Sequence, residues 1–161
     1  MAAVIAGTPA GREGLGRIVA EGLGKRFAQR GKPDTVALDD CSFTVEPGRL
    51  TVLMGPSGCG KSTLAYLLAG HASPDSGTIT MDGLPVRGAG PERMLVFQET
   101  ALWPWMRVID NVTFGPLATG AMSKAEARRE ADALLAEFGL AGFGDKFPHQ
   151  LSGGMKRRAE I

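Results

Sequence analysis

Several features that would assign a protein to another class are scarce in this chain of 161 residues. It has two cysteines, too few for a disulfide framework, and one of them, Cys59, lies inside a glycine-rich loop, so a reducing cytoplasm fits best. No apolar stretch approaches the ~20 residues that cross a bilayer as a helix. The net charge of +1 gives no electrostatic basis for wrapping nucleic acid, and no nucleic-acid partner is expected.

The N-terminal residues 1–16 lack the basic start and the long apolar core of a secretory signal peptide. They are rich in alanine and glycine and contain only a short apolar patch over residues 2–6, so we interpret them as a flexible leader. The overall composition, with 43% hydrophobic and 22% charged residues, is ordinary for a globular chain of about one domain.

Residues 55–63 match in full the phosphate-binding pattern G-x-x-x-x-G-K-[ST]. The apolar run over 50–54 favours a strand before this loop, and residues 62–70 predict a helix that ends at a glycine. Backbone N–H groups of such a loop can surround an anion, and the helix N-terminus adds partial positive charge. Lys61 would contact the β- and γ-phosphates of a nucleotide and Ser62 would bind Mg²⁺, whereas a plain glycine-rich turn is the disfavoured alternative. The candidate phosphate loop comprises Gly55, Pro56, Ser57, Gly58, Cys59, Gly60, Lys61, Ser62 and Thr63.

The hydrophobic pattern changes along the chain, from a strand-rich first part to a helical second part that begins after residue 97. The period of Ser123 to Phe138 predicts a helix, with Ser123 and Glu126 in a capping-box arrangement and Gly139 just past its end. Short strands are expected at residues 17–23, 41–45, 78–81 and 94–97.

A second glycine turn reads Leu151, Ser152, Gly153, Gly154 and Met155. By itself a Ser-Gly-Gly turn before a helix is a weak signal, because a plain helix N-cap is the more common explanation. Its meaning depends on the other motifs of the chain.

Taken in order, the phosphate loop, Gln98 after an apolar run, and the second glycine turn resemble the ATPase subunits of ABC transporters, from about Arg17 to Ile161. The resemblance implies the α/β fold of P-loop NTPases, with a RecA-like core, an antiparallel β subdomain and a helical subdomain. It divides the chain into a leader (1–16), a nucleotide-binding core with the β subdomain (17–97), and the Q-loop with the helical subdomain (98–161).

The resemblance also implies ATP and Mg²⁺ as cofactors and assigns roles to further residues. Gln98 would be the catalytic glutamine that reaches the metal and the attacking water. Phe27 lies where the family places an aromatic ring on adenine, although a core aromatic at the end of a strand is an alternative. The second glycine turn would be the signature that contacts ATP across a homodimer with a second ATPase subunit, with Met155 where the family often has Gln.

Within the family, residues 96–105 and 148–155 look most similar to importers of the nitrate, sulfonate and taurine group. This implies a cytoplasmic subunit on the inner face of the membrane, which works with transmembrane permease subunits and a solute-binding protein. Trp103, Trp105 and Met106 would dock to the permease; a small aromatic cluster in the helical part is the equally weighted alternative.

The family's Walker B pair, Asp-Glu at the end of an apolar strand, and its switch histidine should follow the signature, and neither precedes Ile161. We therefore expect a chain truncated after the signature and inactive in hydrolysis on its own. His71 and His149 stand in the wrong places for the switch and are expected at a helix end and on the surface. Two other functions stay open: a soluble ABC-type ATPase that acts on nucleic acid or the ribosome, and a non-hydrolysing nucleotide-binding fragment. The interval from Thr63 to Leu151 disfavours the first, because it has no room for the insertions or paired cassettes of those proteins.

Overall fold

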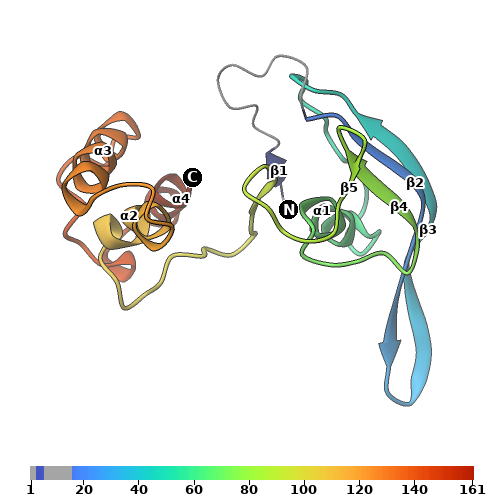
Figure 1. Ribbon diagram of the computed structural model, residues 1–161. Coiled ribbons are helices and arrows are strands. Elements are labelled where there is room, and N and C mark those ends of the chain that lie inside the picture. The colour runs from blue at the N-terminus through green and yellow to red at the C-terminus, as the bar shows by residue number, and fades with distance from the viewer. Residues whose placement is uncertain (1–2, 6–15) are drawn as a thin grey trace. The chain divides into compact units, whose positions relative to one another are not determined.

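The computed structural model describes residues 3–5 and 16–161 of the chain (Figure 1). These residues belong to two compact units, the first ending at Gln98 and the second running from Glu99 to Ile161, and each unit is described by itself. Most of the expected leader, residues 1–2 and 6–15, lies outside the described residues. Ala3–Ile5 forms a short strand, β1, which the sequence analysis did not anticipate.

An antiparallel four-stranded sheet dominates the first unit, in the order β3-β2-β4-β5. The predicted strands at 17–23 and 41–45 are confirmed but are longer than expected, because their pairing continues along a hairpin that extends well beyond β4 (Figure 1). Asp82 and Gly83 have positive φ values of 53° and 80°, as a two-residue hairpin turn requires, and join β4 to β5. The strands are β2 (Ile18–Gln29), β3 (Lys32–Val45), β4 (Ser76–Met81) and β5 (Leu84–Pro85).

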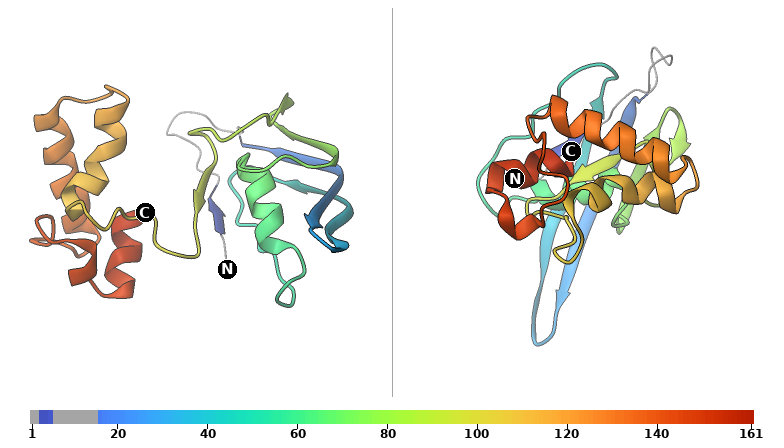
Figure 2. Two further views of the ribbon diagram at one scale, coloured as in Figure 1. Left: turned by 90° about the horizontal axis from the view of Figure 1, so that it is seen from below. Right: turned by 90° about the vertical axis from the view of Figure 1, so that its left-hand side faces the viewer.

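Helix α1 (Lys61–Ala69) covers one face of this sheet (Figure 2). Its apolar side chains pack against residues of β2 and β4. The helix ends, as predicted, at Gly70, whose φ of 77° is the left-handed cap conformation. The buried residues of this core are Ile18, Ala20, Leu23, Leu64, Leu67, Leu68 and Ile79.

The apolar run over residues 50–54 does not form the predicted strand. Leu50 and Met54 are 90% and 84% exposed, and in the described part of the chain no strand pairs with the run. A strand exists only through the ladder it shares with a neighbour, so apolar composition alone was not sufficient. The run at 94–97 does form a strand, β6 (Met94–Val96), which pairs antiparallel with β1; its burial is only partial.

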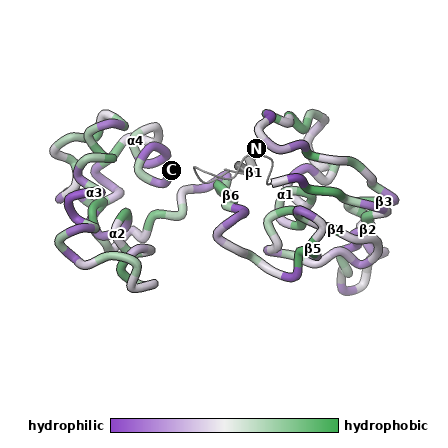
Figure 3. Tube along the Cα trace, turned by 45° about the horizontal axis from the view of Figure 1, so that its top comes forward, coloured by the Kyte–Doolittle hydropathy of each residue, from purple (hydrophilic) through white to green (hydrophobic). Residues whose placement is uncertain are grey.

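The second unit is helical. Helix α3 (Lys124–Glu137) confirms the prediction in detail: Ser123 accepts a hydrogen bond from the Glu126 N–H, and the Glu126 carboxylate accepts one from the Ser123 N–H at 2.9 Å. Hydrophilic and hydrophobic stretches alternate along α3 (Figure 3). The other elements are α2 (Val108–Ala118), the 3-10 turn η1 (Pro148–Gln150) and α4 (Gly153–Glu160).

The core of the second unit is formed by residues from all its helices and from the segment between α3 and η1. Its buried members are Val108, Ile109, Ala131, Leu135, Leu140, Leu151 and Ala159. In the ranges 3–5 and 16–161, no helix has both the length and the apolar character that a bilayer crossing demands.

Candidate functional site

The phosphate loop connects the exposed run 50–54 to the first turn of α1. Gly60 is the N-cap of α1, with φ 88°, and no side chain caps the helix there. The first N–H groups of α1 therefore keep their capacity to bind an anion. The Ser62 hydroxyl lies in this first turn and is exposed, so it is available to a metal ion held beside the anion.

The close approach of the loop to strand β3 explains why the residue before Lys61 is glycine. A Cβ on Gly60 would lie 2.3 Å from the Ala37 carbonyl oxygen and 3.1 Å from a methyl carbon of Leu38. The neighbouring Gly58 also has a positive φ, 82°, but a Cβ there would meet nothing within 4 Å. Of these two glycines, only Gly60 lies against the β2–β3 hairpin.

The Lys61 ammonium lies within the loop that precedes it. Nζ donates to the carbonyl oxygen of Gly55 at 2.8 Å and to that of Pro56, and it lies 3.4 Å from the Cys59 sulfur. A phosphate in the loop would offer the ammonium charge-assisted hydrogen bonds in place of these neutral ones. The lysine side chain therefore folds back over the loop that the sequence motif defines.

Phe27 lies on the β2–β3 hairpin opposite Thr35 and is 46% exposed, so the alternative of a core aromatic is wrong. The Lys25 ammonium lies 5.8 Å from the centroid of the Phe27 ring. Lys25 in turn donates to Asp75 at 2.8 Å, and Arg26 N–H donates to the same carboxylate at 2.7 Å. These bonds, that from Lys25 first, hold the pKa of the Asp75 carboxyl below its usual value. The ring stays available for stacking on a planar ligand.

Gln98 follows β6 at the end of the first unit and its side chain is exposed. His71, expected at a helix end, lies just past the cap of α1, where its N–H donates to the Tyr66 carbonyl at 2.9 Å. His149, expected on the surface, is exposed and stacks on Phe147 with ring centroids 5.8 Å apart.

The second glycine turn lies in the second unit, at the start of α4. Leu151 is buried in the core, whereas Ser152 is the N-cap and its Oγ accepts a hydrogen bond from the Met155 N–H at 3.3 Å. Gly153 and Gly154 form the exposed first turn of α4. The turn presents backbone N–H groups to solvent as the phosphate loop does, but here the first turn has a side-chain cap.

The two tryptophans of the proposed dock differ in their surroundings. The Trp103 ring packs edge-on against Phe114, with centroids 4.1 Å apart and planes at 88°. Its backbone N–H donates to Asn111 Oδ1 at 2.7 Å, and Asn111 Nδ2 donates to the Trp103 and Met106 carbonyls, both at 3.2 Å. Trp105 is 72% exposed. Trp103 therefore fits the alternative of an aromatic cluster within the helical part. Trp105 fits the alternative of an exposed residue that docks to a partner.

Asn111 is a site-shaping residue that the sequence analysis missed. Nothing in the sequence marked it, because its four side-chain hydrogen bonds to the 103–107 backbone depend on how α2 meets the preceding loop.

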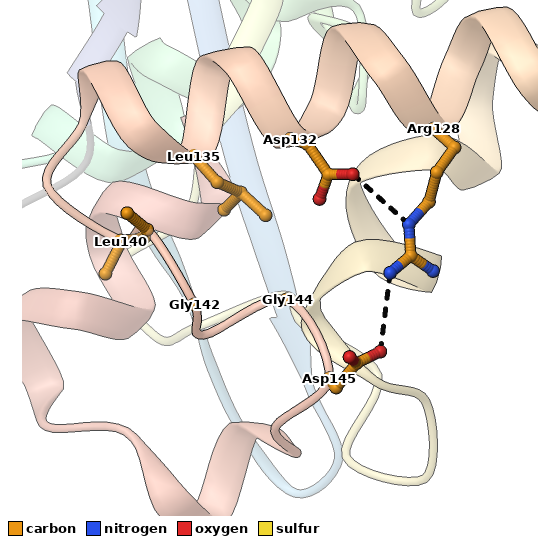
Figure 4. Close-up of a pocket in the computed structure, with 8 residues that line it drawn as sticks. Arg128, Asp132, Leu135, Leu140, Gly142, Gly144 and Asp145 are labelled. Carbon is orange, nitrogen blue, oxygen red and sulfur yellow. Dashed lines mark hydrogen bonds and ion pairs between the residues drawn. The ribbon is translucent and has the colours of Figure 1, made fainter.

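A small pocket of about 90 Å³ in the second unit contains none of the predicted site residues (Figure 4). Arg128 lies between Asp132 and Asp145, at 3.4 and 3.5 Å, beside the glycines of the 140–145 loop. One guanidinium is paired with two carboxylates in the pocket, and we assign no function to it.

Residues 38–161 match the ABC transporter family. The taurine import ATP-binding protein TauB of Chromobacterium violaceum is 45% identical over 147 residues, which are 91% of this chain and 55% of that protein. TauB of Yersinia pestis is 48% identical over 132 residues, 82% of this chain and 50% of that protein. This chain thus spans about half the length of the curated relatives it matches.

Solved structures give the same likeness. One match is the ATP-binding cassette MJ0796, solved as a dimer in a post-hydrolysis state bound to ADP and Pi. It superposes with a TM-score of 0.76 at 26% identity, and the match covers 89% of this chain and 66% of that chain. A further dimeric structure of the same cassette matches with a TM-score of 0.76 at 27% identity, covering 89% and 67%.

Proposed function

The chain belongs to the ABC transporter family, and from this membership we propose that it is the ATP-binding subunit of an importer, coupling ATP binding and hydrolysis to uptake of a solute. The observation that carries the proposal is the phosphate loop. It is a glycine turn held against β3, with the Lys61 ammonium inside it and an α1 N-terminus that no side chain caps. No feature favours an ATPase that acts on nucleic acid or the ribosome.

In this proposal the loop N–H groups and Lys61 bind the phosphates of ATP, and Phe27 stacks on the adenine. Ser62 and Gln98 would hold Mg²⁺, and their hydroxyl and amide oxygens are the hard ligands this ion takes. Bound there, Mg²⁺ would neutralise charge on the phosphates. Gln98 would orient the attacking water.

The second glycine turn is proposed to serve the nucleotide of a second subunit in a homodimer. The N–H groups of Gly153 and Gly154 and the Ser152 hydroxyl would then contact the γ-phosphate bound by the partner subunit. MJ0796, which shares this fold, is dimeric in both matched structures. That likeness supports a dimer here.

We propose permease subunits as partners, with Trp105 as the exposed contact, and a solute-binding protein in the same system. The solute class is proposed as taurine or a similar sulfonate, because relatives at 45–48% identity are named taurine import proteins. Such a subunit would work on the cytoplasmic face of the membrane. A polypeptide of these 161 residues alone contains no Asp-Glu pair after the signature to place metal and water, so we propose that it binds ATP without turning it over.

Titration with a fluorescent ATP analogue tests the central step. Lys61→Ala removes the ammonium from the loop and should weaken nucleotide binding roughly 10- to 100-fold, the range for a charge-assisted hydrogen bond. Lys124→Ala, which removes an exposed lysine at the start of α3, is the matched control and should bind as wild type does. Equal affinities for Lys61→Ala and wild type would refute the phosphate site.

A further inference from the structure

The segment that leads to Gln98 is attached to helix α1 by aromatic contacts. The Phe97 ring centroid lies 6.1 Å from that of Tyr66 and 5.6 Å from that of His71, with the His71 ring edge-on at 61°. Tyr66 is in the second half of α1, and His71 follows the Gly70 cap. Aromatic pairs at these distances contribute stability beyond their apolar burial. Phe97 is thus held at the C-terminal end of α1.

A backbone contact attaches the loop before β6 to the same end of the helix. A Cβ on Gly70 would lie 2.1 Å from the Gly88 carbonyl oxygen, so the two backbones touch there. The buried Arg93 guanidinium donates to that same carbonyl at 2.7 Å, and also to the Glu92 carboxylate. Residues 88–97 are therefore held on α1 both at their start and at their end.

These contacts connect Gln98 to the phosphate loop through one rigid element. Helix α1 begins at Lys61 and is nine residues long, about 13 Å at 1.5 Å per residue. The Cα of Gln98 lies about 3.8 Å from that of Phe97, because they are consecutive residues. Among the described residues β6 pairs with β1 alone, so its own sheet gives it no link to the phosphate loop.

We propose that Tyr66, His71 and Phe97 form an aromatic clasp that positions Gln98 relative to the phosphate loop during ATP hydrolysis. They are positioning residues, which act through Gln98 and do not touch the nucleotide. The proposal rests on the proposed function, in which Gln98 contacts the metal and the water. It requires that loss of the Phe97 ring slows hydrolysis while binding at the phosphate loop is kept.

The test compares two substitutions at Phe97 in a subunit extended beyond Ile161 by a segment with the Asp-Glu pair, which the proposed function requires for hydrolysis. Phe97→Leu keeps an apolar side chain and removes the ring, whereas Phe97→Tyr keeps the ring. We expect Phe97→Leu to lower kcat roughly tenfold or more, since a catalytic group misplaced by about 1 Å can cost 10²-fold. ATP affinity should stay near that of wild type, and Phe97→Tyr should restore kcat. Tyr66→Leu, at a side chain that is already partly exposed, should lower kcat in the same way.

Two further measurements separate positioning from a general structural role. In a Gln98→Ala background, Phe97→Leu should cause no additional fall in kcat, and by itself it should raise the Mg²⁺ concentration that gives half-maximal activity. The clasp is refuted if Phe97→Leu keeps wild-type kcat, if it loses ATP binding in step with kcat, or if its full effect persists without Gln98. Absence of hydrolysis in the extended subunit with wild-type Phe97 would instead overturn the proposed function, and the clasp with it.

Discussion

Gly58 and Gly60 of the phosphate loop have similar φ values but different surroundings. Alanine at each position therefore distinguishes the cost of backbone strain from the cost of a steric clash. Gly58 and Gly60 have φ values of 82° and 88°, so alanine at either position costs about 1–2 kcal/mol of left-handed strain. Only at Gly60 does the added Cβ also meet backbone, the Ala37 carbonyl. We expect Gly60→Ala to lower the unfolding temperature, and the affinity for ATP, more than Gly58→Ala does. Thermal unfolding and ATP titration of both variants check this; equal losses would show that the contact with β3 is unimportant.

The two cysteines should differ in reactivity because their exposure differs. Cys59 is exposed in the phosphate loop, 3.4 Å from the Lys61 ammonium, whereas Cys41 is partly buried in β3 against the sheet core. Maleimide should therefore modify Cys59 first, and MgATP should protect it, because bound phosphates would cover the loop. Mass spectrometry of peptides from time-limited labelling measures both rates. Labelling of Cys59 that saturating MgATP leaves unchanged would show that phosphates do not sit in this loop.

At the scale of single elements, the start of α3 should make stability depend on pH. Hydrogen bonds from the Ser123 hydroxyl and then from its N–H lower the pKa of Glu126. A carboxyl whose pKa is lowered by folding contributes stability above its unfolded-state pKa, and this is lost as the pH falls through the folded-state pKa. Glu126→Ala should therefore be less stable than wild type at neutral pH, and the difference should shrink in acid.

Thermal unfolding followed by circular dichroism, from neutral pH to below the usual pKa range of glutamate, measures that difference. In a Ser123→Ala background, the pH-dependent part of the stability difference caused by Glu126→Ala should be smaller, because the hydrogen bond from the Ser123 hydroxyl is gone. Loss of the Ser123 cap itself should cost about 1 kcal/mol even in acid, where Glu126 is protonated, and somewhat more at neutral pH. A difference between Glu126→Ala and wild type that stays constant into acid would contradict the capping box as its cause.

The elements that could be predicted from sequence are those whose determinants are local. The α3 helix carries its own period, cap and terminal glycine, and it was predicted to within a residue or two. Helix α2 was not predicted, since it contains Gly115 and Pro116, both poor helix formers in a helix interior, and depends on burial of Val108 and Ile109. The phosphate loop was recognised because eight consecutive residues, Gly55 to Ser62, fill its pattern.

Features that depend on distant partners could not be predicted. The run 50–54 has the composition of a strand, but no ladder in the described residues completes it. The distinction between Trp103 and Trp105 depends on Phe114, whose ring faces only the first of them. The Phe97 contacts with Tyr66 and His71 bring together residues some thirty positions apart, which no local motif encodes.

At the scale of the whole molecule, two glycine turns that open helices lie in separate compact units, the phosphate loop in the first and the Leu151–Met155 turn in the second. The α1 N-terminus has no side-chain cap, whereas Ser152 caps α4. In the proposed dimer the first would bind its own ATP and the second would complete the partner subunit's site. The chain would then bind ATP without a second subunit, whereas its Leu151–Met155 turn would act only in the dimer.

Association with the permease can be tested by treating the two tryptophans separately. Trp105 is 72% exposed, so Trp105→Ala should leave the unfolding temperature and ATP binding unchanged. If Trp105 anchors the permease, its loss should cost about 2 kcal/mol or more of binding and sharply reduce co-purification from detergent extracts.

Trp103→Ala should instead lower the unfolding temperature, because it removes the ring that packs on Phe114. Phe138→Ala, at an exposed ring at the far end of α3, is the control for loss of surface apolar area and should retain the permease. A Trp105→Ala subunit that holds the permease as tightly as wild type would exclude Trp105 from the interface and leave the helical unit without its proposed dock.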